Sequence, residues 1–240
     1  MIQLESVTKR FGAATVLHDV SLQVPAGQTL GLIGAGGAGK SLILKLICGL
    51  VRPDKGRVFL DGVEVSALDE TRLMALRGRI GMVFQNYALF DYLSVGENIA
   101  FPLRRLRDRP EAAIIDKVRT RLRQVHLPDI ENLLPAELSG GMKKRVCLAR
   151  ATVHDPPIML CDDPTAGLDP VTTNRIFALL KRLQAENRAT AIIVSHETAY
   201  LRPICDAIAL LDRGRLVFAG PTDDALRHPE VRAFMEGEAA

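Results

Sequence analysis

The sequence predicts an α/β fold with a mainly parallel core sheet, an antiparallel β-subdomain near the N-terminus and an inserted helical subdomain. Three observations support this prediction. A strand, a glycine-rich loop and a helix follow one another over residues 29–50. Apolar runs at 158–161 and 191–195 flank a helical stretch at 171–186, which is the β-α-β order of parallel sheets. Between about 94 and 153, apolar residues recur at helical spacing instead.

Length and composition exclude two broad classes of protein. With 240 residues, the chain is long enough for a substantial core and is not a small disulfide-stapled scaffold. Hydrophobic residues make up 48% and charged residues 25%, the proportions of a globular protein rather than a disordered one. The formal net charge is only +3, so overall charge does not indicate a polyanionic partner.

The first third of the chain reads as strands and turns around one helix. Apolar and polar residues alternate in the first two strands, and Asp61-Gly62 predicts a hairpin turn between two others. Apolar residues at helical spacing predict a helix over residues 40–50. The expected strands are residues 2–7, 16–24, 29–33, 57–60, 63–65 and 80–84.

The rest of the chain divides into a helical segment and a return to the sheet. In the helical segment an apolar stripe (Ile114, Val118, Leu122 and Val125) faces away from many arginines. After the two buried strands we expect a final hairpin, at 207–212 and 216–219, and a helical tail. We treat residues 1–240 as a single domain, with a nucleotide-binding core at about 1–93 and 154–240 and a helical subdomain at about 94–153.

Cysteines and apolar windows bear on the compartment. The cysteines are far apart and lie among apolar neighbours, so we expect core thiols in a reducing compartment: Cys48, Cys147, Cys161 and Cys205. The first twelve residues lack the layout of a secretory signal. The most apolar window, 31–51, contains two lysines and several glycines, so it is not expected to span a membrane. The chain is expected in the cytosol, or at a membrane through a partner.

Residues 34–41 carry the clearest chemical motif. They read GAGGAGKS and fit G-x-x-x-x-G-K-[ST], in which backbone N–H groups turn inward on phosphates. Lys40 would reach the β- and γ-phosphate oxygens, the Ser41 hydroxyl would hold Mg²⁺, and the following helix would point its N-terminal dipole at the same anion. The residues expected to contact the nucleotide are Gly34, Ala35, Gly36, Gly37, Ala38, Gly39, Lys40, Ser41 and Leu42.

This loop has two other interpretations besides a phosphate loop. Gly34, Gly36 and Gly39 also fit the G-x-G-x-x-G fingerprint of dinucleotide-binding folds, with Asp54 about twenty residues further on. Lys40-Ser41 has no role in such a site, whereas a phosphate loop uses it as cation and metal ligand. A purely structural glycine-rich turn is the third interpretation.

Two carboxylates follow the apolar strand at 158–161. Asp162 and Asp163 lie where the carboxyl ends of parallel strands bind ligands. Alone, the pair could be a strand end with a helix cap. With a phosphate loop upstream, Asp162 is the expected partner of Mg²⁺ and Asp163 the candidate to polarise the attacking water.

Further motifs resemble those of the ATP-binding subunits of ATP-binding cassette (ABC) transporters. They are LSGGM at 138–142, AGLDP at 166–170, Gln85 after GMVF and His196 after AIIVS. The resemblance runs from about residue 2 to about 235. It implies an ATPase that binds ATP and Mg²⁺, works as a homodimer and drives an integral membrane permease.

The resemblance also implies roles for single residues. Ser139 can cap a helix that begins at Gly140, and Ser139, Gly140 and Gly141 would meet the γ-phosphate on the opposite subunit. Since the chain has one phosphate loop and one LSGG segment, it must pair to work. Gln85 would sense the γ-phosphate and metal, and His196 would donate a hydrogen bond to the γ-phosphate. Phe11 would be the adenine platform, and Asp169 would lie in the segment that couples the two sites. Without the family, His196 would be a satisfied histidine at a strand end, Gln85 surface polarity and Phe11 ordinary core.

Asp163 departs from the family pattern, in which glutamate usually follows the magnesium-binding aspartate. The aspartate carboxylate is set back by about 1.5 Å, one bond length. Since a base must lie within about 3 Å of its proton, we expect slow hydrolysis or a site that closes slightly further. A second departure is Leu42, where a hydroxyl residue commonly follows GKS; backbone donors can replace that contact.

The subfamily resemblance concerns cargo. Residues 85–104 and 138–151 are similar to the ATPases of Mla/Mce-type lipid transport systems, and RAFMEG at 232–237 resembles the tail of that group. Many importers of polar solutes have glutamines where this chain has MKKR at 142–145. The resemblance implies phospholipid or other lipid transport, an MCE-type substrate-binding protein, a small accessory subunit and a peripheral position on the cytoplasmic side of the bacterial inner membrane.

The sequence is also compatible with two alternative functions. One is a soluble cassette ATPase that acts on nucleic acid or the translation machinery, although such proteins often join two cassettes in one chain. The other is a regulatory ATP-binding module with little turnover, which Asp163 favours. Basic residues such as Arg104, Arg119 and Arg123 lack interleaved aromatics and are diluted by acids, so no nucleic-acid partner is expected.

Overall fold

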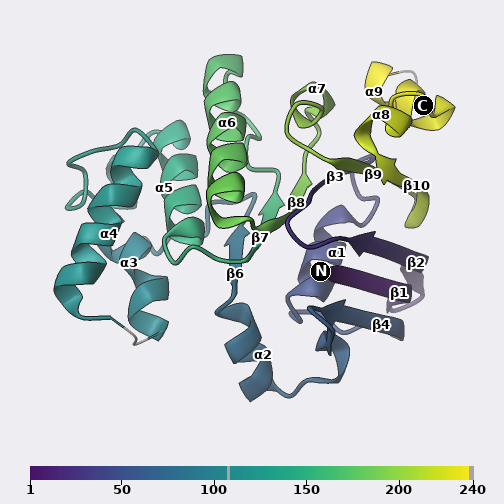
Figure 1. The fold of residues 1–240 in the computed structure, drawn as a ribbon, viewed down its shortest axis with the longest axis horizontal. Coiled ribbons are helices and arrows are strands. Elements are labelled where there is room, and N and C mark those ends of the chain that lie inside the picture. The colour runs from purple at the N-terminus through teal and green to yellow at the C-terminus, as the bar shows by residue number, and fades with distance from the viewer. Residues whose placement is uncertain (107–108, 238–240) are drawn as a thin grey trace.

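A computed structural model describes residues 1–106 and 109–237. Residues 107–108, in the predicted helical subdomain, and 238–240, at the end of the predicted core, lie outside the described residues. The described chain contains two sheets, with helices on both faces of the larger one (Figure 1).

The larger sheet is the predicted, mainly parallel core. Its spatial order is β10-β9-β3-β8-β7-β6, and every neighbouring pair is parallel except β9 and β10. The prediction of a final hairpin is therefore confirmed. The strands are β3 (Thr29–Ile33), β6 (Ile80–Val83), β7 (Ile158–Asp162), β8 (Thr190–Val194), β9 (Ala207–Asp212) and β10 (Arg215–Pro221).

The smaller sheet is the predicted antiparallel β-subdomain. Its order is β2-β1-β4-β5, and β1 pairs with both β2 and β4, so that Ile2 lies opposite Val24 on one side and Leu60 on the other. It packs at the lower right of Figure 1, beside α1. Its strands are β1 (Ile2–Phe11), β2 (Ala14–Val24), β4 (Lys55–Leu60) and β5 (Val63–Glu64).

Helices occupy the segments between the strands. Three of them, α3, α4 and α5, stand together on the left of Figure 1 and fall within the segment predicted to be helical. The helices are α1 (Lys40–Ile47), α2 (Glu70–Arg77), α3 (Val95–Leu106), α4 (Glu111–Gln124), α5 (Gly140–Thr152), α6 (Pro170–Asn187), α7 (Thr198–Leu201), α8 (Thr222–Ala225) and α9 (Pro229–Glu236), with 3-10 turns at Val65–Ala67 and Pro135–Glu137.

The core sheet separates two apolar cores. Successive side chains of a strand point to opposite faces. In β7, Met159 and Cys161 join a core with residues of α3 to α6, whereas Ile158 and Leu160 join a core with α1 and the antiparallel sheet. Packing on both faces fixes the carboxyl edge of the sheet, where the predicted site residues lie.

The first helix is shorter than predicted. It ends at Ile47, and Leu50, expected on its apolar stripe, is exposed. Gly49 has φ +66, its N–H donates to the Leu46 carbonyl, and the Leu50 N–H donates to the Lys45 carbonyl. These two bonds form a Schellman motif, which closes a helix with a glycine in the left-handed conformation.

Two other local expectations need correction. Val65, expected to continue the strand at 63–65, begins a 3-10 turn, because Leu68 N–H bonds back to its carbonyl. Helix α2 was not expected from its apolar pattern. It is fixed at its start by Asp69, whose side chain accepts a hydrogen bond from the Arg72 N–H at 2.8 Å.

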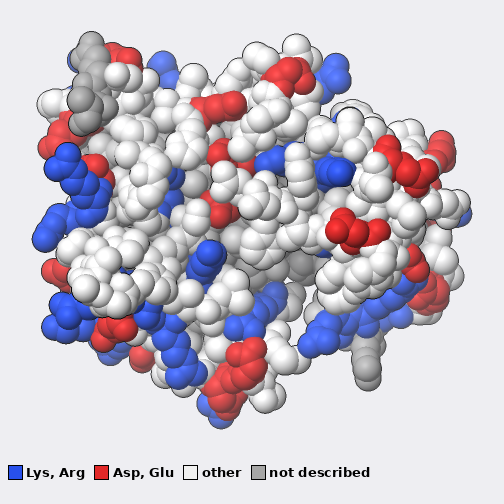
Figure 2. All heavy atoms as spheres, turned by 180° about the vertical axis from the view of Figure 1, so that it is seen from behind, with Lys and Arg blue, Asp and Glu red and all other residues white. Residues whose placement is uncertain are grey.

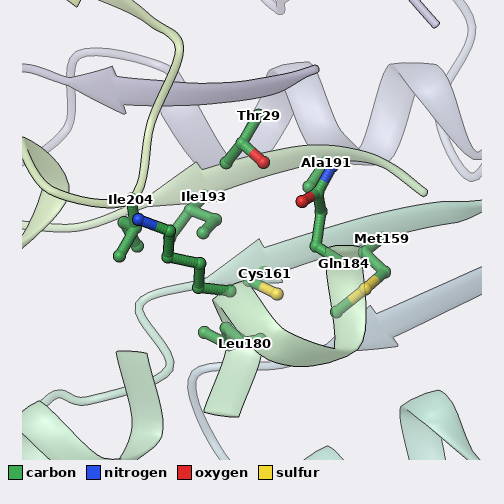
Figure 3. Close-up of a pocket in the computed structure, with 9 residues that line it drawn as sticks. Thr29, Met159, Cys161, Leu180, Gln184, Ala191, Ile193 and Ile204 are labelled. Atoms are coloured by element: carbon green, nitrogen blue, oxygen red, sulfur yellow. The ribbon is translucent and has the colours of Figure 1, made fainter. Parts of the chain in front are cut away.

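The interior is closely packed on the α6 face of the sheet. A cavity of about 10 Å³ lies there, between Leu180 and Gln184 of α6 and residues of β3, β7 and β8 (Figure 3). This volume is enough for one water at most. A larger ligand therefore has no place at this position.

The cysteines lie in the core, as predicted. All four are free and buried. Burial raises the pKa of the Cys147 thiol to about 11 and that of Cys161 to about 12, so both stay protonated and unreactive at neutral pH. Within the described residues, no helix combines the length and apolar character needed to cross a bilayer.

Candidate functional site

The carboxyl ends of β3, β6, β7 and β8 meet around one cavity of about 340 Å³. This is where open α/β sheets bind ligands. The structure thus brings together side chains that the sequence places more than 150 residues apart. The lining residues are Gly36, Gly37, Gly39, Lys40, Ser41, Leu42, Gln85, Asp162, Asp163, Val194 and His196.

Two glycines of the loop are required by geometry. A Cβ on Gly34, which has φ +147, would lie 2.0 Å from the carbonyl oxygen of Leu211. Gly39 has φ +106, and a Cβ there would lie 2.7 Å from a methyl group of Leu17. The glycines therefore let the loop pack against its neighbours while α1 begins directly at Lys40.

Lys40 is held inside the loop that it follows. Its side chain is only 5% exposed, and its ammonium donates to the carbonyl oxygens of Gly34, at 2.7 Å, and Ala35, at 2.8 Å. Burial lowers the pKa of this ammonium, and the nearby Asp163 and Asp162 carboxylates oppose the shift. A buried cation in a cavity with donor N–H groups is suited to phosphate oxygens.

The predicted magnesium ligands come together. The Ser41 hydroxyl donates to Oδ1 of Asp162 at 2.9 Å, and Gln85 lines the same cavity. A hydroxyl, a carboxylate and an amide are the oxygen donors that Mg²⁺ prefers, together with phosphate oxygens. The residues present therefore fit a nucleotide-bound Mg²⁺.

Asp163 lines this cavity in a constrained conformation. It is buried and has φ +47, and its N–H donates to the Val194 carbonyl at 3.0 Å. Burial raises the pKa of its carboxyl, whereas His196 and then Lys144 oppose that shift. The ring Nε2 of His196 is 4.0 Å from Oδ2 of Asp163. The raised pKa brings this carboxylate closer to the range of a general base.

The length of the Asp163 side chain can be tested directly. We expect Asp163→Glu to raise ATP turnover severalfold, up to about tenfold, because the carboxylate would reach a proton now beyond its range. Steady-state phosphate release measures this. As a matched control, Asp162→Glu should lower turnover, because Asp162 already bonds Ser41 at 2.9 Å. Unchanged turnover in Asp163→Glu would show that carboxylate length does not limit the reaction.

The remaining predicted residues lie outside the cavity. Ser139 caps α5 as expected, with its hydroxyl accepting from the Met142 N–H at 3.3 Å, and it is exposed together with Gly140. Phe11 is 54% exposed at the end of β1, with the Lys9 ammonium 5.4 Å from its ring centre. Neither residue is among the described residues that line the cavity, so their roles toward nucleotide stay predictions, as do those of Gly141 and Asp169.

One buried residue at the site was missed by the sequence analysis. Lys144 of α5 donates to the carbonyl oxygens of Gln85, at 3.0 Å, and Asp163, at 3.2 Å. The loop after Gln85 also contains Tyr87 and Ala88, at φ +50 and +53. Such left-handed conformations cost about 1–2 kcal/mol per residue outside glycine. The only available signal in the sequence was a lysine on a helix, which gives no direction for its side chain.

Comparisons with known proteins agree with this geometry. A protein-family model described as "ABC transporter" matches residues 17–166, more than half of the chain. The methionine import ATP-binding protein MetN of Caulobacter vibrioides is 42% identical over 231 residues, which are 95% of this chain and 69% of that protein. The probable ribonucleotide transport ATP-binding protein mkl of Mycobacterium leprae is 40% identical over 238 residues, covering 98% of this chain and 69% of that protein.

A solved structure extends the comparison to three dimensions. It is a dimeric ATP-binding cassette in a post-hydrolysis state bound to ADP and Pi. The TM-score is 0.87 at 32% identity, with 92% of this chain and 99% of that chain covered. The predicted fold class is therefore confirmed. These relatives are a methionine import protein and a probable ribonucleotide transport protein, so they do not support the specific expectation of lipid cargo.

Proposed function

This chain belongs to the ABC transporter family, and we propose that it is the ATP-hydrolysing subunit that powers a bacterial lipid transporter. Members of the family hydrolyse ATP, form dimers of their cassettes and work with a membrane permease. One observation gives the main support for the residue assignments. The side chains of one cavity include those of Lys40, Ser41, Asp162 and Asp163.

The site residues divide the reaction between them. Lys40 and the loop N–H groups bind the phosphates, and Ser41, Asp162 and Gln85 would hold Mg²⁺. When bound, Mg²⁺ neutralises charge on the β- and γ-phosphates. Asp163 accepts a proton from the attacking water, and His196 donates to the γ-phosphate. ATP and water then give ADP and inorganic phosphate.

The second half of each site comes from another copy of the chain. The exposed N-terminus of α5, with Ser139 as its cap, is a group of N–H donors with no phosphate of its own. We place it on the γ-phosphate held by the opposite subunit, together with Gly140 and Gly141. Phe11 would stack on the adenine. Binding of ATP then joins the two copies and hydrolysis separates them.

A groove of about 990 Å³ gives the permease a place to dock. It lies between α2, β6, the loop after Gln85 and α3, and it is lined by apolar side chains such as Met74, Phe90 and Phe101. Met74 and Phe101 are exposed, and Arg105 lies at the same groove. Large exposed apolar patches mark protein contacts. Since Phe84, the chain neighbour of Gln85, lines the groove, a docked permease segment would move with the nucleotide site.

Co-purification from membranes tests the partner and its place. We expect the wild-type chain to retain an integral membrane protein in mild detergent and Phe101→Asp to lose most of it, because a charge in the groove removes apolar contact. Ile115→Asp, an exposed apolar residue of α4 outside the groove, is the matched control. Equal retention by Phe101→Asp and Ile115→Asp would place the docking surface elsewhere.

The observations support two different candidate cargoes. Lipid cargo is supported by residues 85–104 and by the segment LSGGMKKR, which resemble Mla/Mce-type ATPases. Methionine is the second candidate, because the Caulobacter vibrioides relative is a methionine import protein. In reconstituted complexes we expect phospholipid to stimulate ATP turnover and L-methionine to leave it unchanged. Stimulation by L-methionine alone would replace the lipid proposal with amino acid import.

For a lipid transporter we also expect further partner proteins and a particular location of the chain. An MCE-type substrate-binding protein and a small accessory subunit would join the permease, and the chain would be peripheral on the cytoplasmic side of the bacterial inner membrane. The same co-purification identifies these partners. A complex with a single permease and a soluble binding protein would favour methionine import.

Surface charge favours transport over action on nucleic acid. Basic and acidic side chains lie side by side over much of the face in Figure 2. On the helical segment, Arg104 pairs with Glu111 at 2.5 Å and Arg119 with Glu131 at 3.4 Å. Such paired charges leave fewer free cations for phosphates than a nucleic-acid surface requires.

A further inference from the structure

Helix α5 holds the loop after Gln85 through side chains on one of its faces. Residues three positions apart lie on adjacent turns of the same face. All the bonds end on backbone carbonyl oxygens of the loop, so they fix its path whatever its side chains do. The donors are Lys144, Cys147 and Arg150, and the acceptors are the carbonyls of Gln85 at 3.0 Å, Tyr87 at 2.8 Å and Ala88 at 2.6 Å, respectively.

Lys144 differs from the other two donors because it also reaches a second loop. Its ammonium donates to the Asp163 carbonyl at 3.2 Å, and it lies 5.4 Å from the ring centre of Tyr87. The residue is only 2% exposed. Burial disfavours an ammonium and lowers its pKa. A neutral donor could bond one carbonyl with a smaller desolvation free energy than an ammonium. Bridging two loops, however, needs a long side chain with several N–H donors, which lysine provides.

Both loops depend on such support. Asp163, Tyr87 and Ala88 all have positive φ angles without being glycine. Residues in such conformations persist only where their surroundings hold them. Lys144 contacts the backbone at the start of one loop, at Gln85, and at Asp163 itself.

We propose that Lys144 is a positioning residue for ATP hydrolysis, which sets the Gln85 loop and the Asp163 backbone relative to each other from inside α5. The inference rests on the proposed roles of Gln85 and Asp163. Because Ser139 caps the start of α5, the same helix joins this site to the surface expected to meet the partner subunit's nucleotide. Misplacement of one loop would impair the chemical step while the phosphate loop still binds ATP.

The test compares turnover with binding in Lys144 variants of the full chain. In Lys144→Met we expect kcat to fall roughly a hundredfold, the effect of about 1 Å of misplacement, with KM and the Kd for ATP within threefold. Lys144→Arg, which keeps a cation with several donors, should recover most of kcat. Lys143→Met, at the neighbouring position of the same helix, is the matched control and should keep wild-type kcat. If Lys144→Met does not fold, Lys144→Gln takes its place with the same expectation.

The outcomes separate this inference from the proposed site. A wild-type kcat in Lys144→Met, or an Arg variant no better than Met, would overturn the positioning role. A parallel loss of kcat, ATP affinity and Tm would also overturn it, because that result shows packing alone. If Lys40→Ala and Asp163→Asn retain turnover, the proposed site itself fails. If they lose turnover while Lys144→Met keeps it, only this inference fails.

Discussion

Lys40→Ala is expected to lower ATP turnover by roughly 10²–10³-fold and to weaken ATP binding by a similar factor. The ammonium is buried inside the phosphate loop, with the carbonyls of Gly34 and Ala35 as its bonded partners. Among the described residues that line the cavity, Lys40 is the only lysine. Its removal takes away a direct positive charge on the β- and γ-phosphates, which the loop N–H groups, as neutral donors, do not replace. Calorimetric titration with ATP and steady-state phosphate release measure the two losses.

The matched control for this prediction is Lys45→Ala. Lys45 lies on the same helix but is exposed and does not line the cavity. Its removal should leave both binding and turnover within about twofold, because exposed charges contribute little. Equal losses in Lys40→Ala and Lys45→Ala would point to a general electrostatic effect and would remove Lys40 from the site.

Asp163→Asn is expected to lower turnover by about 10²–10⁴-fold while ATP binding is retained. The amide keeps the shape of the buried side chain but cannot accept a proton from water. The backbone bond from its N–H to the Val194 carbonyl is unaffected by the change. Single-turnover phosphate release separates the chemical step from nucleotide binding and product release.

Asp223→Asn, at an exposed position of α8, is the control for removal of a carboxylate. It should retain wild-type turnover. If Asp163→Asn hydrolyses ATP as fast as this control, water is polarised by another group. The low-turnover regulatory alternative makes a different prediction, namely that the wild-type chain itself turns over as slowly as Asp163→Asn.

The nucleotide site could be predicted because its parts are local in sequence. GAGGAGKS between a strand and a helix, and Asp162-Asp163 after a buried strand, each define one corner of the site. Parallel strands bring their carboxyl ends to one edge, so these corners must meet. The cavity contains both, together with Gln85 and His196.

Other features depend on contacts that no local pattern encodes. Lys144 bonds Gln85 from 59 residues away, and its direction follows from how α5 packs. Leu50 fits a helical stripe, yet Gly49 ends the helix before it, because turn chemistry outweighs apolar spacing there. The roles proposed for Ser139 and Phe11 need a bound nucleotide or a second copy of the chain, so the fold of a single copy does not test them.

We propose that ATP joins two copies of this chain face to face. Sedimentation velocity of purified Asp163→Asn with ATP and Mg²⁺ tests it most directly, since slow hydrolysis preserves the joined state. A dimer with ATP, a monomer with ADP, and a monomer with ATP when Ser139→Arg is added would support the account. A monomer under all conditions, in the presence of the permease as well, would contradict it.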